Sequence, residues 1–177
     1  MGYRSTIALT ALLQGGAVPS LGEAAAANTN IITTQKLDWE VADKLAVEAV
    51  CVCASHGYSV TATVVDSSGQ QQAVVKGDTA ALQSLSVSYR KAYTAYAYGL
   101  AFNKNSTSEL VAAKLTGRGD GALLASVPEV LFIAGGVTLR TADHTVIGGI
   151  GVSGGLGDDK DEACAQEAAD KYQGEFH

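Results

Sequence analysis

Three tyrosines recur at helical spacing near the middle of this chain. Tyr89, Tyr93 and Tyr96 stand at positions i, i+4 and i+7, so they share one face of a helix predicted over residues 80–101. Aromatic rings arranged in this way usually pack into a core or a subunit interface. The same rings also suit the wall of a pocket for a flat aromatic ligand. The sequence leaves both interpretations open.

A second stripe on the same predicted helix carries positive charge. Lys91, Thr94 and Tyr98 stand at i, i+3 and i+7, and Arg90 lies beside them. Ammonium and guanidinium groups bind carboxylates, so this stripe could hold an anionic group of a ligand. The alternative is an ordinary solvated helix surface.

A glycine-rich run covers residues 148–157. Its spacing resembles the dinucleotide-binding fingerprint, but its glycines fall inside a predicted strand and no strand–helix–strand unit surrounds them. Glycines in a strand allow a helix or a flat ligand to approach closely. The N–H groups after Gly154, at the start of the last predicted helix, could also receive a carboxylate.

The remaining polar residues give no pattern for catalysis or for zinc. His56, His144 and His177 are the only histidines, and no two have the spacing of a zinc site. Ser153 lacks the surroundings of a hydrolase nucleophile, and no pair of acidic residues stands out. No catalytic residue is predicted. No specific metal ligand is predicted either, although a single histidine or another weak ligand could still serve as one.

The three cysteines do not form a complete disulfide framework, because their number is odd. Cys51 and Cys53 point to nearly opposite sides of a predicted helix, so they cannot grip one metal ion together. Small buried apolar side chains are the favoured interpretation. A Cys53–Cys164 or a Cys51–Cys164 disulfide stays open if the protein is exported.

Length and composition predict one folded domain. The chain has 177 residues, 47% of them hydrophobic, with a net charge of −6. This acidic balance disfavours nucleic acid and anionic membrane surfaces as partners. No apolar run is long enough to span a bilayer.

The first 30 residues stand apart from the predicted domain. A single early arginine, a short apolar stretch and a run of alanines resemble a secretory signal. An N-terminal arm is the alternative. We therefore predict a segment over residues 1–30 and a domain over residues 31–177, with a secreted or periplasmic location if the segment is a signal and a cytoplasmic one otherwise.

Hydrophobic periodicity and turn residues predict an α+β fold. The order is helix, two strands, two helices, two strands and a final helix, which indicates an antiparallel sheet with helices packed on it. The predicted helices cover residues 35–55, 80–101, 109–115 and 158–172, and the strands cover residues 58–65, 70–76, 130–134 with an extension over 137–140, and 146–153. A flexible stretch is expected at residues 117–121. The apolar face of the second helix carries Leu82, Leu85, Tyr89, Tyr93, Tyr96 and Leu100.

Four motifs in order resemble the GlcG/HbpS-like family, whose domain also forms the C-terminal part of PduO-type proteins. They are residues 64–69 (VVDSSG), 91–95 (KAYTA), 135–139 (GGVTL) and 146–155 (VIGGIGVSGG), the last followed by residues 158–165. The resemblance covers about residues 34–173. It implies a five-stranded antiparallel sheet flanked by helices, assembled into dimers or larger rings.

The resemblance also implies a ligand, since several members of the family bind haem or a related tetrapyrrole. The implied ligand region is the helix from Lys91 to Tyr98 with the loops at Gly135, Gly136 and Gly154. The expected function is haem binding for capture or sensing. Two alternatives are an enzyme that uses the same pocket for a small aromatic or hydroxy-acid metabolite, and an oligomeric structural or interaction module. The expected binding residues are Arg90, Lys91, Tyr93, Thr94, Tyr98, Gly135, Gly136 and Gly154.

Overall fold

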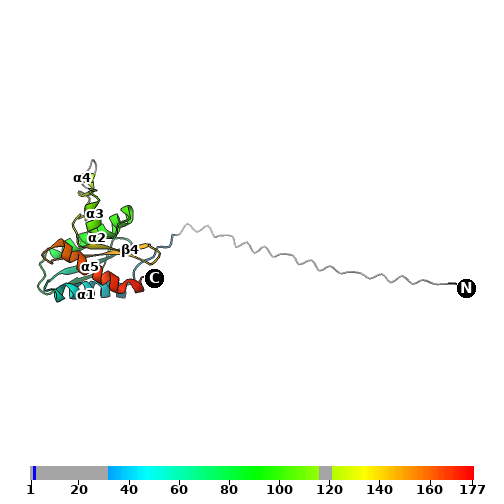
Figure 1. Cartoon of the computed structure of the whole chain (residues 1–177), viewed down its shortest axis with the longest axis horizontal. Coiled ribbons are helices and arrows are strands. Elements are labelled where there is room, and N and C mark those ends of the chain that lie inside the picture. The colour runs from blue at the N-terminus through cyan, green and yellow to red at the C-terminus, as the bar shows by residue number, and fades with distance from the viewer. Residues whose placement is uncertain (1, 3–31, 116–120) are drawn as a thin grey trace. The chain divides into compact units, whose positions relative to one another are not determined.

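The computed structural model describes residue 2, residues 32–115 and residues 121–177 (Figure 1). The predicted signal or arm over residues 1–30 lies outside this part of the chain, apart from residue 2. Most of the stretch expected to be flexible, at residues 117–121, lies outside it as well.

The helices and strands follow the predicted order, with two additional short helices at residues 121–124 and 173–175. They are α1 (Trp39–Ser55), β1 (Thr61–Asp66), β2 (Gln71–Lys76), α2 (Ser84–Phe102), α3 (Thr107–Ala112), α4 (Gly121–Leu124), β3 (Gly136–Arg140), β4 (Val146–Ser153), α5 (Asp158–Tyr172) and the short 3-10 helix η1 (Gln173–Glu175). Helix α1 begins later than predicted because Asp38 caps it, with its Oδ1 accepting from the Glu40 N–H at 2.7 Å. The predicted hairpin turn between β1 and β2 is also present, with Gly69 at a φ of 74°.

The described residues form one sheet of four strands, in the order β2-β1-β4-β3, with every neighbouring pair antiparallel. The α+β class and the antiparallel sheet are confirmed, but the expectation of five strands is wrong. Residues 130–134, predicted as a strand, bond to helix α2 instead. The Leu131 N–H donates to the Thr94 hydroxyl at 2.7 Å, and the Val130 carbonyl accepts from the Arg90 guanidinium at 2.8 Å. The strand begins only at Gly136.

One face of the sheet is apolar and carries the main core. Helices α1 and α5 lie side by side on this face, as Figure 1 shows. Alternate residues of three strands point toward them, as expected for a pleated sheet with one buried apolar face. These strand residues are Ala62, Val64, Val137, Leu139, Ile150 and Val152.

The other face of the sheet is small and polar, and helix α2 packs closely on it. A Cβ atom at Gly151 would lie 2.2 Å from the Ser88 carbonyl oxygen, so only glycine permits this approach. Buried hydroxyl pairs join the two layers, Thr61 with Ser84 at 2.6 Å and Thr63 with Ser88 at 2.8 Å. The sheet therefore contacts the face of α2 that carries its small residues.

This packing changes the expected orientation of α2. Its buried side consists of small residues and one lysine, namely Ser84, Ser88, Lys91, Ala92, Thr94, Ala95 and Gly99. The predicted apolar face is only partly covered by this chain, since Leu82 and Leu100 are 78% and 56% exposed and the three tyrosines are half-buried. The physical reason is the glycine-rich strand β4, whose close approach to α2 leaves no room for large side chains between them.

A disulfide joins the two helices on the apolar face. Cys53 in α1 and Cys164 in α5 are bonded, with their Cα atoms 5.6 Å apart, and Cys51 is free and exposed. The favoured prediction of three unpaired buried cysteines is therefore wrong. Of the two disulfides left open by the sequence, the structure contains Cys53–Cys164, because Cys53 faces α5 while Cys51 points outward.

Candidate functional site

Lys91 lies at the centre of the candidate site, between helix α2 and the beginning of helix α5. Its side chain is only 1% exposed, and its ammonium lies 2.9 Å from Asp161 Oδ2 and 3.3 Å from Asp158 Oδ1. Asp161 also accepts a hydrogen bond from the Gly155 N–H at 2.7 Å. A buried charge needs such partners because leaving water is costly. The ammonium of Lys91 is therefore neutralised within the chain.

Gly135 and Gly136 pass directly over Lys91, as the predicted site requires. A Cβ at Gly135 would lie 2.7 Å from the Lys91 Nζ, and one at Gly136 would lie 2.5 Å from the Lys91 carbonyl oxygen. Gly135 also has a φ of 124°, which L residues with side chains rarely adopt. Both glycines are thus needed for this loop to close over α2.

Glu162 fixes the same loop from helix α5. Its Oε2 accepts hydrogen bonds from the N–H groups of Gly135 and Ser108, each at 3.0 Å, and its other oxygen accepts from the Ser108 hydroxyl. Burial by itself raises the pKa of the Glu162 carboxyl, but these hydrogen bonds outweigh it and hold the pKa below its ordinary value. The carboxylate joins α3, the loop before β3 and α5.

Arg90 and Thr94 hold the segment before this loop. Thr94 is buried and its oxygen accepts from the Leu131 N–H, while Arg90 is half-buried and donates to the Val130 carbonyl. Nearby, the ring of Tyr98 lies edge-on to the ring of Phe132, with 5.1 Å between centroids. Arg90, Thr94 and Tyr98 therefore lie along the flank of α2 that faces residues 130–134.

Tyr93 lies on the opposite flank of the helix. A Cβ at Gly69 would lie 3.0 Å from its ring, which places Tyr93 against the turn between β1 and β2. Tyr96 donates from its hydroxyl to the Ser67 carbonyl in the same turn, and Tyr89 lies 6.1 Å from Tyr93 between ring centroids. The tyrosine stripe thus borders the side of α2 away from Phe132.

Gly154 is a further predicted residue that falls outside the Lys91 cluster. A Cβ there would lie 2.7 Å from the Ser59 carbonyl oxygen, at the start of β1. Its neighbour Gly155 does reach the cluster through Asp161. Neither Asp161 nor Glu162 is among the predicted binding residues. The acidic start of α5 is the sequence signal that points to them, because a buried lysine needs a carboxylate partner.

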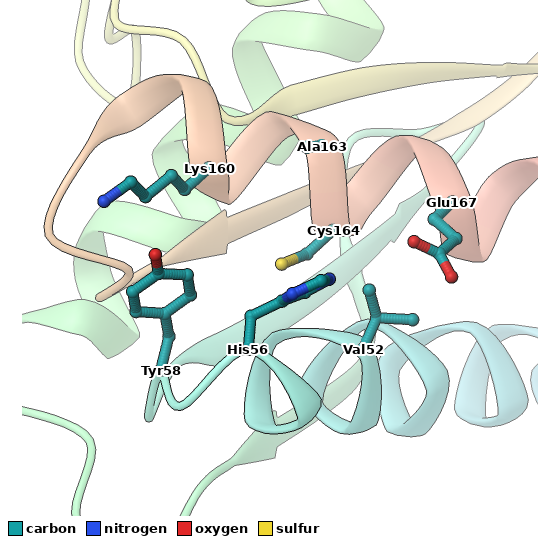
Figure 2. A pocket seen from close by; sticks show the side chains of 7 residues that line it. All are labelled: Val52, His56, Tyr58, Lys160, Ala163, Cys164 and Glu167. Atoms are coloured by element: carbon teal, nitrogen blue, oxygen red, sulfur yellow. The ribbon is translucent and has the colours of Figure 1, made fainter.

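A separate pocket of about 210 Å³ lies between the end of α1 and helix α5 (Figure 2). It is lined by Val52, His56, Tyr58, Lys160, Ala163, Cys164 and Glu167. Its volume is below the range of about 300–1,000 Å³ typical of sites for drug-sized ligands. The predicted binding residues do not line it. In the part of the chain that the structure describes, no three His, Cys, Asp or Glu side chains are grouped as a metal site.

These features define a class of protein: an α+β domain whose antiparallel sheet carries two helices on one face and one lysine-anchored helix on the other. Residues 37–170 match the family described as haem degrading protein HbpS-like. The chain belongs to this family. The resemblance stated from the four motifs is confirmed.

Solved structures agree with this assignment. The crystal structure of HbpS has 34% sequence identity and a TM-score of 0.71, covering 80% of this chain and 94% of that one. A double mutant of HbpS from Streptomyces reticuli has 33% identity and a TM-score of 0.72, covering 86% and 98%. The crystal structure of a PduOC:haem complex has 26% identity and a TM-score of 0.64, covering 76% and 94%. No curated protein matches the chain. Among the described residues, no helix is long and apolar enough to cross a membrane.

Proposed function

We propose that this protein binds haem, for haem capture or sensing, on the exposed side of helix α2. The observation that carries the proposal is the surface formed by Arg90, Tyr98 and Phe132. Here Arg90, held by the Val130 carbonyl at 2.8 Å, lies on the same flank of α2 as Tyr98, whose ring packs edge-on against Phe132 of the facing segment. The family description and the haem complex of the PduOC relative support haem as the ligand.

The residues on this side of α2 fit the chemistry of haem. A flat macrocycle packs well on aromatic side chains, and its carboxylates suit a guanidinium. Of the two predicted cations, Arg90 is the one available for this role, because Asp161 and Asp158 already neutralise Lys91. When bound, haem would supply the iron chemistry, while the protein holds and orients it.

In this proposal the other predicted residues hold the helix and the neighbouring loops in place and do not contact haem. Lys91 anchors α2 to α5, and Gly135 and Gly136 let the loop close over it. Thr94 holds residues 130–134 against the helix. Tyr93 lies on the opposite flank of α2, against the turn between β1 and β2, and does not contact this surface. Gly154 contributes to the shape of the adjoining loop.

In this proposal a second copy of the chain packs against the other flank of α2, which carries the tyrosine stripe. Leu100 is 56% exposed on the flank of α2 that also carries the tyrosine stripe, and Leu82, two residues before α2, is 78% exposed. Large exposed apolar side chains grouped with aromatic rings are typical of interaction surfaces. We therefore propose a homo-oligomer with α2 at its interface, and light scattering of the purified protein measures its size.

We further propose that the protein is exported. The Cys53–Cys164 disulfide supports this location, because disulfides persist in oxidising compartments and are rare in the cytosol. Cell fractionation together with mass spectrometry of the mature N-terminus tests it. A reduced, unprocessed protein found only in the cytoplasm contradicts it.

Hemin titration of the purified protein tests the ligand. We expect a shifted Soret band that saturates near one haem per chain or per dimer. A titration curve that matches free hemin at every ratio contradicts haem binding. An absorption spectrum of the protein as isolated shows whether it already carries the ligand.

A further inference from the structure

Arg140 lies at the end of strand β3, away from the Lys91 cluster. The pairing of β3 with β4 shifts register between Leu139 and Arg140, and such an irregularity redirects the side chain that follows it. The guanidinium reaches the C-terminal end of α2. Its Nη2 donates to the carbonyls of Gly99 at 3.1 Å and Lys104 at 3.2 Å, and its Nη1 donates to the His144 carbonyl at 3.1 Å.

These contacts leave the charge of Arg140 without a counter-charge. All three acceptors are neutral carbonyls, and no carboxylate of the described residues forms an ion pair with this guanidinium. The C-terminus of a helix offers only about half a negative charge. The Nε of Arg140 is buried and has no hydrogen-bond partner. Capping of the C-terminal end of α2 therefore explains the hydrogen bonds to the Gly99 and Lys104 carbonyls. It does not explain the missing counter-charge or the unpartnered Nε.

An open pocket of about 350 Å³ borders this guanidinium, lined by Asn103, Asn105, Arg140 and His144. Two amides and an imidazole beside a guanidinium are all able to donate hydrogen bonds. Asn103 and His144 have φ values of 50° and 68°, a left-handed conformation that asparagine and histidine tolerate better than most residues. The donors are thus set by two tight turns, one after α2 and one between β3 and β4.

The pocket continues into a second hollow of about 420 Å³, which shares Asn105, Arg140 and His144 with it. The second hollow adds Gln166 and Gln173, and also the carboxylate of Glu109. The Glu109 Oε2 accepts from the Asn105 N–H at 3.0 Å. One end of the combined hollow therefore favours an anion, while the other offers both donors and an acceptor.

We propose that this pocket binds the oxyanion group, carboxylate or phosphate, of a small polar molecule. The oxyanion lies against Arg140, Asn103 and His144, and the polar remainder extends toward Gln166 and Gln173. This site is separate from the haem surface around Arg90 and does not depend on it.

Isothermal titration of the full chain with inorganic phosphate, and separately with succinate, tests the proposal. We expect saturable binding of at least one of them at one site per chain. Binding of phosphate alone identifies a phosphate site, and binding of succinate alone identifies a carboxylate site. The absence of saturable binding for both overturns the proposal.

Asn103→Asp is the most informative variant, because it keeps the size and the left-handed turn but places a negative charge in the pocket. Loss of a hydrogen bond to a charged group reduces affinity about tenfold, and we expect at least this reduction. His144→Asn, which also tolerates the left-handed turn, should weaken binding as well. Gln71→Glu on the exposed part of β2 is the control, since it adds the same charge elsewhere.

The variants separate this site from adventitious binding. Unchanged affinity in both Asn103→Asp and His144→Asn overturns the proposal, because the anion then binds elsewhere. Equal weakening in Gln71→Glu also overturns it, because the effect then comes from net charge alone. Hemin titration of Asn103→Asp should match the unaltered protein, so failure here and failure of the haem proposal can be told apart.

Discussion

The ammonium of Lys91 lies 2.9 Å from the Oδ2 of Asp161, and both side chains are buried. This ion pair joins helices that lie on opposite faces of the sheet, with α2 on the polar face and α5 on the apolar face. Asp158 adds a second, more exposed carboxylate 3.3 Å from the same ammonium. The pair therefore fixes how α2 is held relative to the rest of the domain.

Removing one member of this pair should destabilise the fold strongly. In Lys91→Met, Asp161 is left as a buried charge without its partner, which costs about 3–5 kcal/mol. Asp161→Asn should cost a similar amount, while Asp158→Asn should cost about 1 kcal/mol or less because this carboxylate is 59% exposed. Urea unfolding followed by circular dichroism measures all three. Equal effects of Asp158→Asn and Asp161→Asn contradict the assignment of Asp161 as the main partner.

The disulfide should stabilise the domain through the length of chain that it closes. Cys53 and Cys164 are 111 residues apart, and loop-closure entropy gives typical contributions of about 2–4 kcal/mol. We expect a lower urea midpoint for the double variant Cys53→Ala, Cys164→Ala and for the reduced protein. Cys51→Ser is the control, because its thiol is free and exposed. Insensitivity of the unaltered protein to reductant contradicts this prediction.

Gly151 should not accept even one additional carbon. A Cβ there would lie 2.2 Å from the Ser88 oxygen and 2.4 Å from the Ala92 nitrogen, both backbone atoms of α2. Gly151→Ala should therefore cost about 3 kcal/mol or more through overpacking. Gly174→Ala, where a Cβ would meet nothing within 4 Å, is the matched control. Thermal unfolding compares the two, and similar melting temperatures contradict the close packing of α2 on β4.

Acid should weaken the domain in part through Glu162. Its pKa in the folded protein lies below the ordinary value of 4.5, because hydrogen bonds to the carboxylate outweigh the effect of burial. Its contribution is therefore fully present above pH 4.5 and is lost as the pH falls through the lowered folded pKa. Unfolding curves over this acidic range measure the loss.

The variant Glu162→Gln should show a shallower decline of stability with falling pH. Near neutral pH it should be less stable by about 1–3 kcal/mol, since several hydrogen bonds to the charge are weakened. Glu167→Gln, at an exposed position of the same helix, is the control. An unchanged pH dependence in Glu162→Gln shows that this carboxylate is not the group responsible.

The proposed haem surface depends on Arg90. Arg90→Gln removes the guanidinium charge, so hemin should bind about tenfold more weakly as one charged hydrogen bond is lost. Lys76→Gln makes the same change of charge on the exposed side of β2 and should leave hemin affinity unaltered. Soret titrations measure both. Equal affinities in the two variants remove Arg90 from the proposal.

Tyr93 distinguishes a ligand surface from a pure assembly surface. Tyr93→Ala removes a half-buried ring that lies 6.1 Å from Tyr89 between ring centroids and packs against the turn at Gly69. If haem binding depends on the packing of a second copy against the tyrosine stripe, the variant should lose both hemin affinity and oligomer size. Loss of assembly with unchanged hemin affinity would instead favour the structural or interaction module. Light scattering and Soret titration on the same sample decide between these outcomes.

The local pattern of the sequence predicted the long helices, the hairpin and their order, but not the short helices α4 and η1. The turn at residues 66–69 and the acidic start of the last helix are local signals. Four motifs in the correct order identified the resemblance to the family. The fold class follows from the order of helices and strands alone. The fifth strand came from the resemblance, and the assignment of residues 130–134 as a strand failed because Thr94 and Arg90 bond to that backbone.

The tertiary structure decided which side of each element is buried. Periodicity placed the leucines and tyrosines of α2 on one face, but the glycines of β4 bring the helix so close that only its small residues fit against the sheet. Likewise, the sequence could not tell a solvated Lys91 from a buried one, since Asp161 lies 70 positions away. Residues distant in sequence determine these environments, so no local spacing reveals them.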